Sequence, residues 1–212
     1  MSYSVDYVKL YPYGQAFRKE AKALNICIID IHNQFVEMHK TWKGNQWHEV
    51  AVAWNSLIEF FNSTTNFLVE AVPYNIEIDA YNYSVKDHKP LTEPTPTPQD
   101  NIPGKLDEDT NNGKVELSDE GAPKENGIKD KIDDYFSKII TLLTKLENTL
   151  NETTSIWVSS GANASRRNFS ESKAELNKNI TQIKTALNDK LKSAMSDYTE
   201  AETAAKTTAK HF

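Results

Sequence analysis

Histidine and cysteine are the side chains of this sequence with the chemistry for metal binding or nucleophilic catalysis. Cys27 is the only cysteine, which excludes an intrachain disulfide and suits a buried thiol on a helix. His48 lies in "WHEVA", which lacks the second histidine of a zinc-protease helix. His32 and His39 can share one helix face, but two ligands do not make a zinc site. We therefore expect no catalytic residues, no metal, no cofactor and no enzymatic activity, since no phosphate loop or nucleophile motif occurs either.

The composition narrows the classes of partner. The chain has 212 residues, of which 38% are hydrophobic and 25% charged, and its net charge is −6. A nucleic-acid-binding protein needs a basic face, so the acidic balance argues against that class. The longest apolar runs are too short to span a membrane, and the first residues lack the apolar core of a signal peptide. We expect neither a nucleic-acid partner nor a stable membrane span.

Residues 89–126 differ in composition from the rest of the chain. They contain six of the eight prolines and no aromatic residue, and their nine acidic groups outnumber four basic ones. Such a segment buries too little apolar surface to offset the entropy of ordering it. The composition predicts a disordered or extended linker between two flanking regions, residues 1–88 and 127–212.

Each flanking region contains an apolar seam with alternating spacings of four and three residues, typical of a long helix packed at a shallow angle. The first seam is Phe17, Ala21, Leu24, Ile28, Ile31, Phe35, Met38 and Trp42, and the second is Ile132, Phe136, Ile139, Leu143, Leu146, Leu150, Thr153 and Trp157. The two seams are 115 residues apart. The same offset matches later apolar residues, with Trp54 on Phe169 and Ala80 on Met195. The pattern is an internal repeat.

The short connection after each seam tryptophan permits only an antiparallel helical hairpin. We therefore predict an all-α protein of two hairpins, residues 1–88 and 127–212. We expect them to pack as an intramolecular four-helix bundle joined by the disordered linker, although a swapped dimer is also physically possible. Pro73 falls inside the second helix of the first hairpin, where proline removes a hydrogen bond, so we expect a kink or break near residues 72–74.

The two turns are predicted to differ. Gly44, two residues after Trp42, can adopt the positive φ that reverses a chain at the end of a helix. Trp54 supplies an aromatic side chain from the returning helix. In the second repeat Ser159 stands at the Gly44 position and Gly161 follows, so that turn must be built differently, with Ser159 as a candidate helix cap. Arg166 and Arg167, just inside the next helix, are expected to be solvated.

A helical hairpin with a Trp-x-Gly turn and an aromatic residue twelve positions later resembles the WXG superfamily of type VII (ESX) secretion substrates of Gram-positive bacteria. The resemblance implies antiparallel pairing of hairpins into four-helix bundles. It also implies a C-terminal Tyr-x-x-x-Asp/Glu motif that forms, with the partner's Trp-x-Gly turn, an export signal read by a secretion ATPase. Two such motifs occur, Tyr83 with Asp87 and Tyr198 with Glu202, and both follow the 115-residue offset.

By this resemblance, Trp42 is expected near Tyr198 and Glu202, and Trp157 near Tyr83 and Asp87. The chain would be a tandem WXG-like protein, secreted without a signal peptide and cytoplasmic before export. Its partners would be a secretion ATPase and a co-secreted effector. The alternatives are an intracellular helical adaptor or chaperone for a larger effector and a purely structural bundle.

Overall fold

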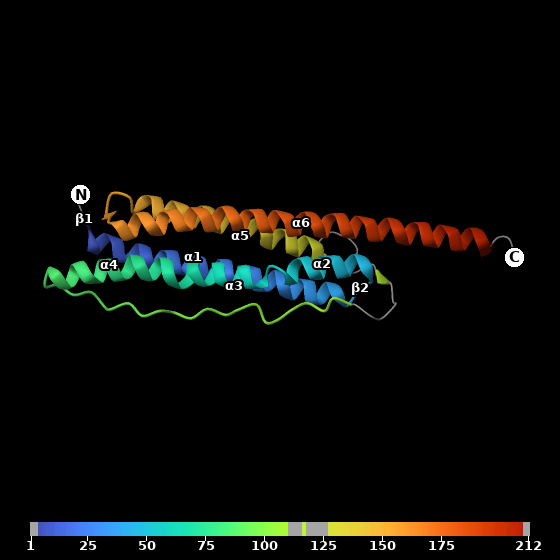
Figure 1. Ribbon diagram of the computed structural model, residues 1–212, viewed down its shortest axis with the longest axis horizontal. Coiled ribbons are helices and arrows are strands. Elements are labelled where there is room, and N and C mark those ends of the chain that lie inside the picture. Colours follow the sequence, from blue (N-terminus) through green and yellow to red (C-terminus); the bar gives the residue numbers. More distant parts are fainter. Residues whose placement is uncertain (1–3, 110–115, 118–126, 210–212) are drawn as a thin grey trace. The chain divides into compact units, whose positions relative to one another are not determined.

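The computed structural model describes residues 4–109, 116–117 and 127–209, and almost all of its regular structure is helical (Figure 1). The helices are α1 (Tyr7–His39), α2 (Asn45–Asn55), α3 (Ile58–Asn66), the π-helical turn η1 (Phe67–Ala71), α4 (Val72–Lys86), α5 (Ile128–Glu152) and α6 (Ser160–Ala209). The strands are dipeptides: β1 (Ser4–Val5), β2 (Trp42–Lys43), β3 (Glu116–Leu117) and β4 (Trp157–Val158). The predicted all-α class is confirmed.

The chain forms two compact units. Unit 1 consists of residues 1–29, 59–102 and 137–178, and unit 2 of residues 30–58, 103–136 and 179–212. Each unit therefore draws on both predicted hairpins. Unit 1 contains the turn of the second hairpin, and unit 2 contains the turn of the first.

Both apolar seams form the core, as their spacing predicts. Every seam residue from Phe17 to Trp42 is at most 1% exposed, and every one from Ile132 to Trp157 is at most 2% exposed. Thr153, the one polar seam member, is fully buried, and its hydroxyl donates to the Leu150 carbonyl at 2.7 Å. That bond within the helix satisfies the buried hydroxyl.

The break expected at Pro73 takes the form of a π-helical turn. The Val72 N–H donates to the Phe67 carbonyl, five residues back, and Pro73 lies in the first turn of α4. The change in hydrogen-bond spacing from η1 to α4 accommodates the proline, which has no N–H to donate to the preceding turn. After Pro73 the chain is helical to Lys86. The second helix of the first hairpin is thus divided into α2, α3, η1 and α4.

Gly14 lies where α1 meets α4 in unit 1. A Cβ atom at this position would be 2.5 Å from Cγ of Glu77 and 3.1 Å from the Pro73 carbonyl oxygen. We expect Gly14→Ala to lower the free energy of unfolding by about 1–3 kcal/mol through overpacking, although alanine is the better helix former. Urea unfolding measures the difference.

Gly161 provides the matched control for that substitution. A Cβ atom there would be 3.6 Å from Oγ of Ser159 and 3.7 Å from the Asp79 carboxylate, which are ordinary contacts. Gly161→Ala, also in a helix, should be neutral or slightly stabilising. Equal effects of the two substitutions would contradict the close approach at Gly14.

Of the two states predicted for the linker, disordered or extended, residues 89–109, which we call the strap, have the extended one. The strap has no helix or strand, and Ile102 and Leu106 are only 6% and 4% exposed (Figure 1). Residues 110–115 and 118–126 of the predicted linker lie outside the described residues. The strap is thus extended and packed.

Helix side chains hold the strap by hydrogen bonds to its backbone. In unit 1, Tyr11 donates to the Thr92 carbonyl at 3.0 Å and Asn25 to the Asp100 carbonyl at 2.8 Å. In unit 2, the Asn55 amide donates to the Leu106 carbonyl at 2.9 Å and accepts from the Leu106 N–H at 2.7 Å. These bonds replace those a strand would receive from a neighbouring strand.

Among the helices of the described residues, none combines the length and apolar character that crossing a bilayer requires.

Candidate functional site

The first turn, in unit 2, is built as the sequence predicts. Gly44 has φ 107°, which glycine adopts without strain, and its N–H donates to the Asp109 carboxylate at 2.8 Å. Trp42 is 1% exposed. The dipeptide β2, which contains Trp42, pairs with β3 in antiparallel register, so Trp42 lies opposite Leu117. A residue of the predicted linker thereby pairs with the turn of the first hairpin.

Aromatic rings fill the space inside this turn. Trp47 contacts Trp42 edge to face, with ring centroids 5.8 Å apart, and its indole N–H donates to the Asp107 carbonyl of the strap at 2.8 Å. Trp54 is fully buried, 5.0 Å from the Phe35 ring. Its expected role, to anchor the returning helix, agrees with these contacts.

His32 accepts a hydrogen bond from the Trp54 indole N–H at Nδ1, at 3.1 Å, so the neutral ring carries its proton on Nε2. Burial lowers the pKa of His32, and protonation would also break this bond. The unfolded chain binds the proton below about pH 6.5, whereas the folded chain binds it only at lower pH. We expect the free energy of unfolding to include the whole contribution of neutral His32 above about pH 7 and to decrease as the pH falls below 6.5.

Urea unfolding at several pH values between 5 and 8 tests this dependence. His32→Gln should flatten the slope, and His88→Asn, at an exposed position, should leave it unchanged. Burial also lowers the pKa of His39, so part of the slope should remain in the His32 variant. A slope identical in all three proteins would show that His32 is not responsible.

The second turn, in unit 1, is capped by serine. The Ser159 hydroxyl accepts the Ala162 N–H at 3.0 Å, which caps the first turn of α6, and Gly161 lies inside that helix. Arg166 is half-buried, contrary to the expectation that it is solvated, whereas Arg167 is exposed as expected. The Arg166 guanidinium lies 5.3 Å from the Trp157 ring centroid and donates to Thr153 Oγ1 at 2.9 Å and to the Trp157 carbonyl at 3.2 Å. Burial lowers the pKa of Arg166.

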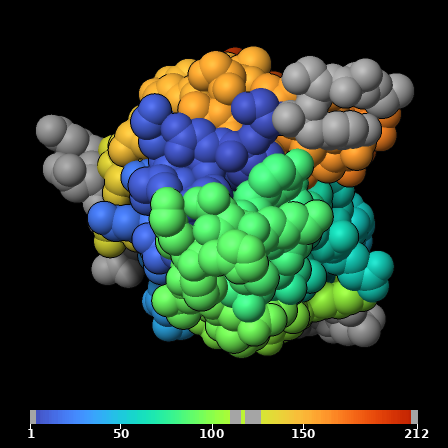
Figure 2. Space-filling model, turned by 90° about the vertical axis from the view of Figure 1, so that its left-hand side faces the viewer, coloured from blue at the N-terminus to red at the C-terminus, as the bar shows by residue number. Residues whose placement is uncertain are grey.

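The indole N–H of Trp157 has its hydrogen-bond acceptor within unit 1. Its indole N–H donates to the Asp79 carboxylate of α4 at 2.7 Å, and the Ser159 hydroxyl donates to the same carboxylate at 3.2 Å. The dipeptide β4 pairs with β1, so Trp157 lies opposite Val5. In Figure 2 the first residues of the chain, in blue, lie between the end of α4, in green, and the region around the start of α6, in orange. Trp157 is fully buried.

Tyr83 and Asp87 do not form the expected partner of Trp157, whose hydrogen bond goes to Asp79. Tyr83 is in α4, and Asp87 is the residue that ends it. The Asp87 carboxylate instead accepts the Tyr7 hydroxyl at 2.6 Å, which is the main reason that its pKa is lowered, and Lys89 adds to the effect. This motif is occupied by contacts of its own chain.

The π-helical turn explains why the two motifs differ. It adds one residue to the first hairpin, and one residue turns a helix by about 100°. Just past η1, Val72 and Ile76 still match the buried Leu187 and Leu191 at an offset of 115. One turn further on, the buried Ala80 matches Ala194 at an offset of 114, since Ala194 is 5% exposed and Met195 is 40% exposed. The prediction that Met195 repeats the buried role of Ala80 is therefore wrong. Tyr83 and Tyr198 do not occupy equivalent places on their helices.

Trp42 and Tyr198 do come together. They line a pocket of about 580 Å³ in unit 2, which we call the Trp42 pocket. Its walls are Trp42, Lys43, Asn45, Gln46, Ala194, Asp197, Tyr198 and Ala201. The first hairpin contributes its turn, and the second contributes one face of α6. The sequence predicted the pairing of Trp42 with Tyr198 but not the other walls.

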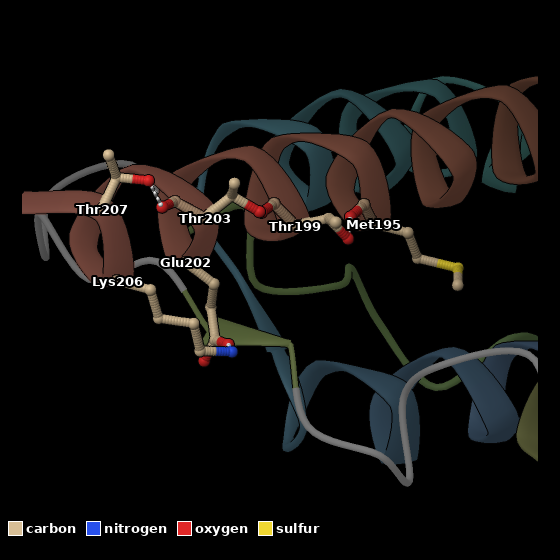
Figure 3. Close-up of polar contacts among 6 residues, drawn as sticks. All are labelled: Met195, Thr199, Glu202, Thr203, Lys206 and Thr207. Carbon is tan, nitrogen blue, oxygen red and sulfur yellow. Dashed lines mark hydrogen bonds and ion pairs between the residues drawn. The ribbon is translucent and has the colours of Figure 1, made fainter. Parts of the chain in front are cut away.

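Glu202 lies outside the Trp42 pocket. It forms an ion pair with Lys206 at 2.8 Å, and this contact is the main reason that the pKa of Glu202 is lowered (Figure 3). On the same stretch of α6, the hydroxyls of Thr199, Thr203 and Thr207 donate to carbonyls four residues back. Residues 199–208 are all exposed. The end of α6 thus presents threonine methyl groups and charged side chains to solvent.

Comparison with protein-family models, with curated proteins and with solved structures gave no match. Within residues 4–109, 116–117 and 127–209, no group of three or more histidine, cysteine, aspartate or glutamate side chains is arranged to hold a metal ion. The site with the most distinctive geometry in the described residues is accordingly the Trp42 pocket.

Proposed function

We propose that this chain is a non-enzymatic helical protein that acts by binding other proteins, as a tandem WXG-like substrate of type VII secretion. The Trp42 pocket together with the exposed end of α6 would form its export signal, recognised by a secretion ATPase. The same surface would also serve a co-secreted effector.

One observation carries this proposal: the Trp42–Gly44 turn of one hairpin and Tyr198 of the other line a single pocket. A recognition site assembled from both halves exists only in the folded chain. A secretion ATPase that recognises this site would therefore bind only chains whose two hairpins are correctly paired. The exposed residues 199–208 extend the surface beyond the pocket.

We further propose that the two hairpins pair within one chain as a four-helix bundle. Two contacts between the halves support this pairing. In unit 1, Phe17 meets Phe169 edge to face at 5.9 Å, and in unit 2, Gln46 donates to Ser193 at 3.2 Å. Covalent linkage makes such pairing independent of protein concentration. The mass in solution should be that of one chain across a wide concentration range, and a dimer would indicate swapping instead.

Secretion of point variants tests the export signal. Tyr198→Ala is expected to reduce the amount of protein in the culture supernatant of a type VII-competent Gram-positive host about tenfold or more, while the cell pellet retains the protein. Glu202→Ala should act in the same direction. Tyr83→Ala is the matched control and should be exported normally, because Asp87, the acidic member of that motif, already accepts from Tyr7 of its own chain.

Each variant needs a thermal unfolding curve, so that lost export is not confused with lost folding. Tyr198 is only half-buried, so its replacement should leave the fold intact. Normal export of a folded Tyr198→Ala protein would refute the proposed signal.

A further inference from the structure

A groove that lies entirely in unit 1 has the chemistry of a binding site for an organic cation. The strap contributes Pro96 to its walls, and the helices contribute Ser63, Asn66, Phe67, Glu70, Ala71 and Tyr74. We call it the Phe67 groove, and its volume is about 410 Å³. We propose that the Phe67 groove binds the guanidinium group of an arginine side chain that a partner polypeptide presents. This proposal goes beyond the export signal, since the groove and the Trp42 pocket share no residue.

Two aromatic side chains line the groove on one stretch of helix. Phe67 and Tyr74 are seven residues apart, which is about two helical turns, and the small side chain of Ala71 lines the groove between them. Both rings are half-buried, so part of each is accessible to a ligand. A cation in the groove would therefore lie against aromatic surface, which attracts it through the quadrupole of the rings. Phe67, Glu70 and Ala71 belong to η1, and π-helical turns are rare elements that occur frequently at functional sites.

The charge of the groove is negative and uncompensated. Among its walls, all of which are described residues, Glu70 carries the only charge, and no described residue forms an ion pair with it. Arg18 donates to Thr97, next to Pro96 on the strap, but its charge is compensated by the ion pair with Glu77. Residues 59–102 carry seven acidic groups and two basic ones, so the surrounding surface also favours a cation. A cationic ligand would meet a half-buried carboxylate that has no other partner.

The walls favour guanidinium over other organic cations. A guanidinium is flat, so it stacks on aromatic rings, and its edge directs two N–H groups at one carboxylate such as that of Glu70. The side-chain oxygens of Ser63 and Asn66 offer further acceptors. A quaternary ammonium has no N–H for these acceptors, and the ammonium of lysine is more strongly hydrated and costs more to desolvate.

The openness of the groove to solvent indicates where the arginine comes from. Each wall residue is half-buried or exposed, whereas sites for small molecules enclose most of the ligand surface. The groove therefore suits a side chain held out by a larger polypeptide.

Nuclear magnetic resonance of the whole 15N-labelled protein tests the inference through the backbone amide signals of residues 66–72. The probe is N-acetyl-arginine methylamide, and the control is N-acetyl-citrulline methylamide, which has nearly the same shape but no charge. We expect the arginine probe to shift these signals saturably. The citrulline control should bind about tenfold more weakly, because it loses the charge that Glu70 and the rings attract. N-acetyl-lysine methylamide and tetramethylammonium should each bind about threefold more weakly or worse.

Substitutions in the groove test the same contacts from the protein side. Glu70→Gln removes the charge but keeps the shape, so it should weaken binding of the arginine probe about tenfold. Glu59→Gln is the matched control, because it removes one exposed negative charge of the same unit outside the groove, and it should leave binding unchanged. Tyr74→Leu should weaken binding about threefold through the lost cation–π contact. Circular dichroism and thermal unfolding establish that each variant is folded.

Equal binding of the citrulline control would overturn the proposal, and so would equal weakening by Glu70→Gln and Glu59→Gln. Lysine or tetramethylammonium binding as tightly as the arginine probe would also overturn it. Free L-arginine is the other source of the same guanidinium and should bind no more tightly than the blocked probe. If it binds about tenfold more tightly, the groove recognises the free amino acid and the proposed polypeptide partner is wrong.

Discussion

Replacing Arg18 by methionine is expected to lower the free energy of unfolding by about 3–5 kcal/mol, the largest effect we anticipate for a charged residue. Arg18 and Glu77 form an ion pair in unit 1 whose side chains are only 13% and 6% exposed. The second arm of the Arg18 guanidinium donates to Thr97 of the strap at 3.0 Å. Removal of Arg18 leaves Glu77 buried and unpaired, which is costly because water no longer solvates the charge. Urea unfolding measures the loss.

The double variant Arg18→Met with Glu77→Met distinguishes two causes of the lost stability, the unpaired charge of Glu77 and the lost packing of Arg18. It should recover most of the stability, since two apolar side chains of similar volume often replace a buried pair without net loss. Lys9→Met, which removes an exposed ion pair with Asp6, should change stability by less than about 1 kcal/mol. If the double variant is as unstable as Arg18→Met, the unpaired charge is not the cause.

Trp54→Ala is expected to lower the free energy of unfolding by about 3–5 kcal/mol, because a fully buried indole leaves a large cavity. The ring packs on Phe35 in unit 2 and donates to His32, so its loss also leaves a buried imidazole nitrogen without a donor. Chemical unfolding monitored by circular dichroism reports the change without relying on tryptophan fluorescence.

Trp54→Phe is the informative companion. It keeps an aromatic ring but removes the N–H, so we expect a smaller loss of about 1–3 kcal/mol. Val52→Ala, on the exposed side of α2, should cost less than about 1 kcal/mol. A Trp54→Phe loss equal to that of alanine would mean that the hydrogen bond, not the ring volume, dominates at this position.

The helical core could be predicted from the sequence because its pattern repeats over many residues. Sixteen seam positions with one spacing, from Phe17 to Trp42 and from Ile132 to Trp157, are all buried. Gly44 was predictable for a different reason, since a reversal right after a long helix favours a residue that tolerates positive φ. These signals are local and need no knowledge of tertiary contacts.

The strap could not be predicted, because composition reports only on its own side chains. Few of them are apolar, so the composition indicates only a disordered or extended segment and not that it is packed. What orders it lies elsewhere in the sequence, on Asn25, Asn55, Trp47 and His48, whose polar groups bond to strap carbonyls. Nothing in an isolated asparagine indicates that its amide will meet a backbone more than 50 residues away.

The candidate site was only partly predictable for a similar reason. Trp42 and Tyr198 carry recognisable motifs, and the structure places both at one pocket. The single residue added by η1 turns the rest of α4, and the acceptor for the Trp157 indole N–H is Asp79, which carries no sequence motif. A one-residue insertion leaves the helical pattern almost intact. The offset of 115 found from the seams therefore gives no sign that a residue has been added after them. Arg166 was missed because its contacts depend on the shape of that turn.

The way the strap is held has a consequence for how this protein would vary during evolution. Most of its hydrogen bonds to the helices involve main-chain groups, including the carbonyls of Thr92, Asp100, Leu106 and Asp107, which every amino acid possesses. Substitutions in the strap therefore leave these bonds intact, provided that Ile102 and Leu106 stay apolar. Related chains should show a strap that varies at most positions other than Thr97 and Asp109, whose side chains bond to Arg18 and Gly44, beside helices whose asparagines do not vary. An alignment would then mark as unconstrained a segment that is in fact structurally specified.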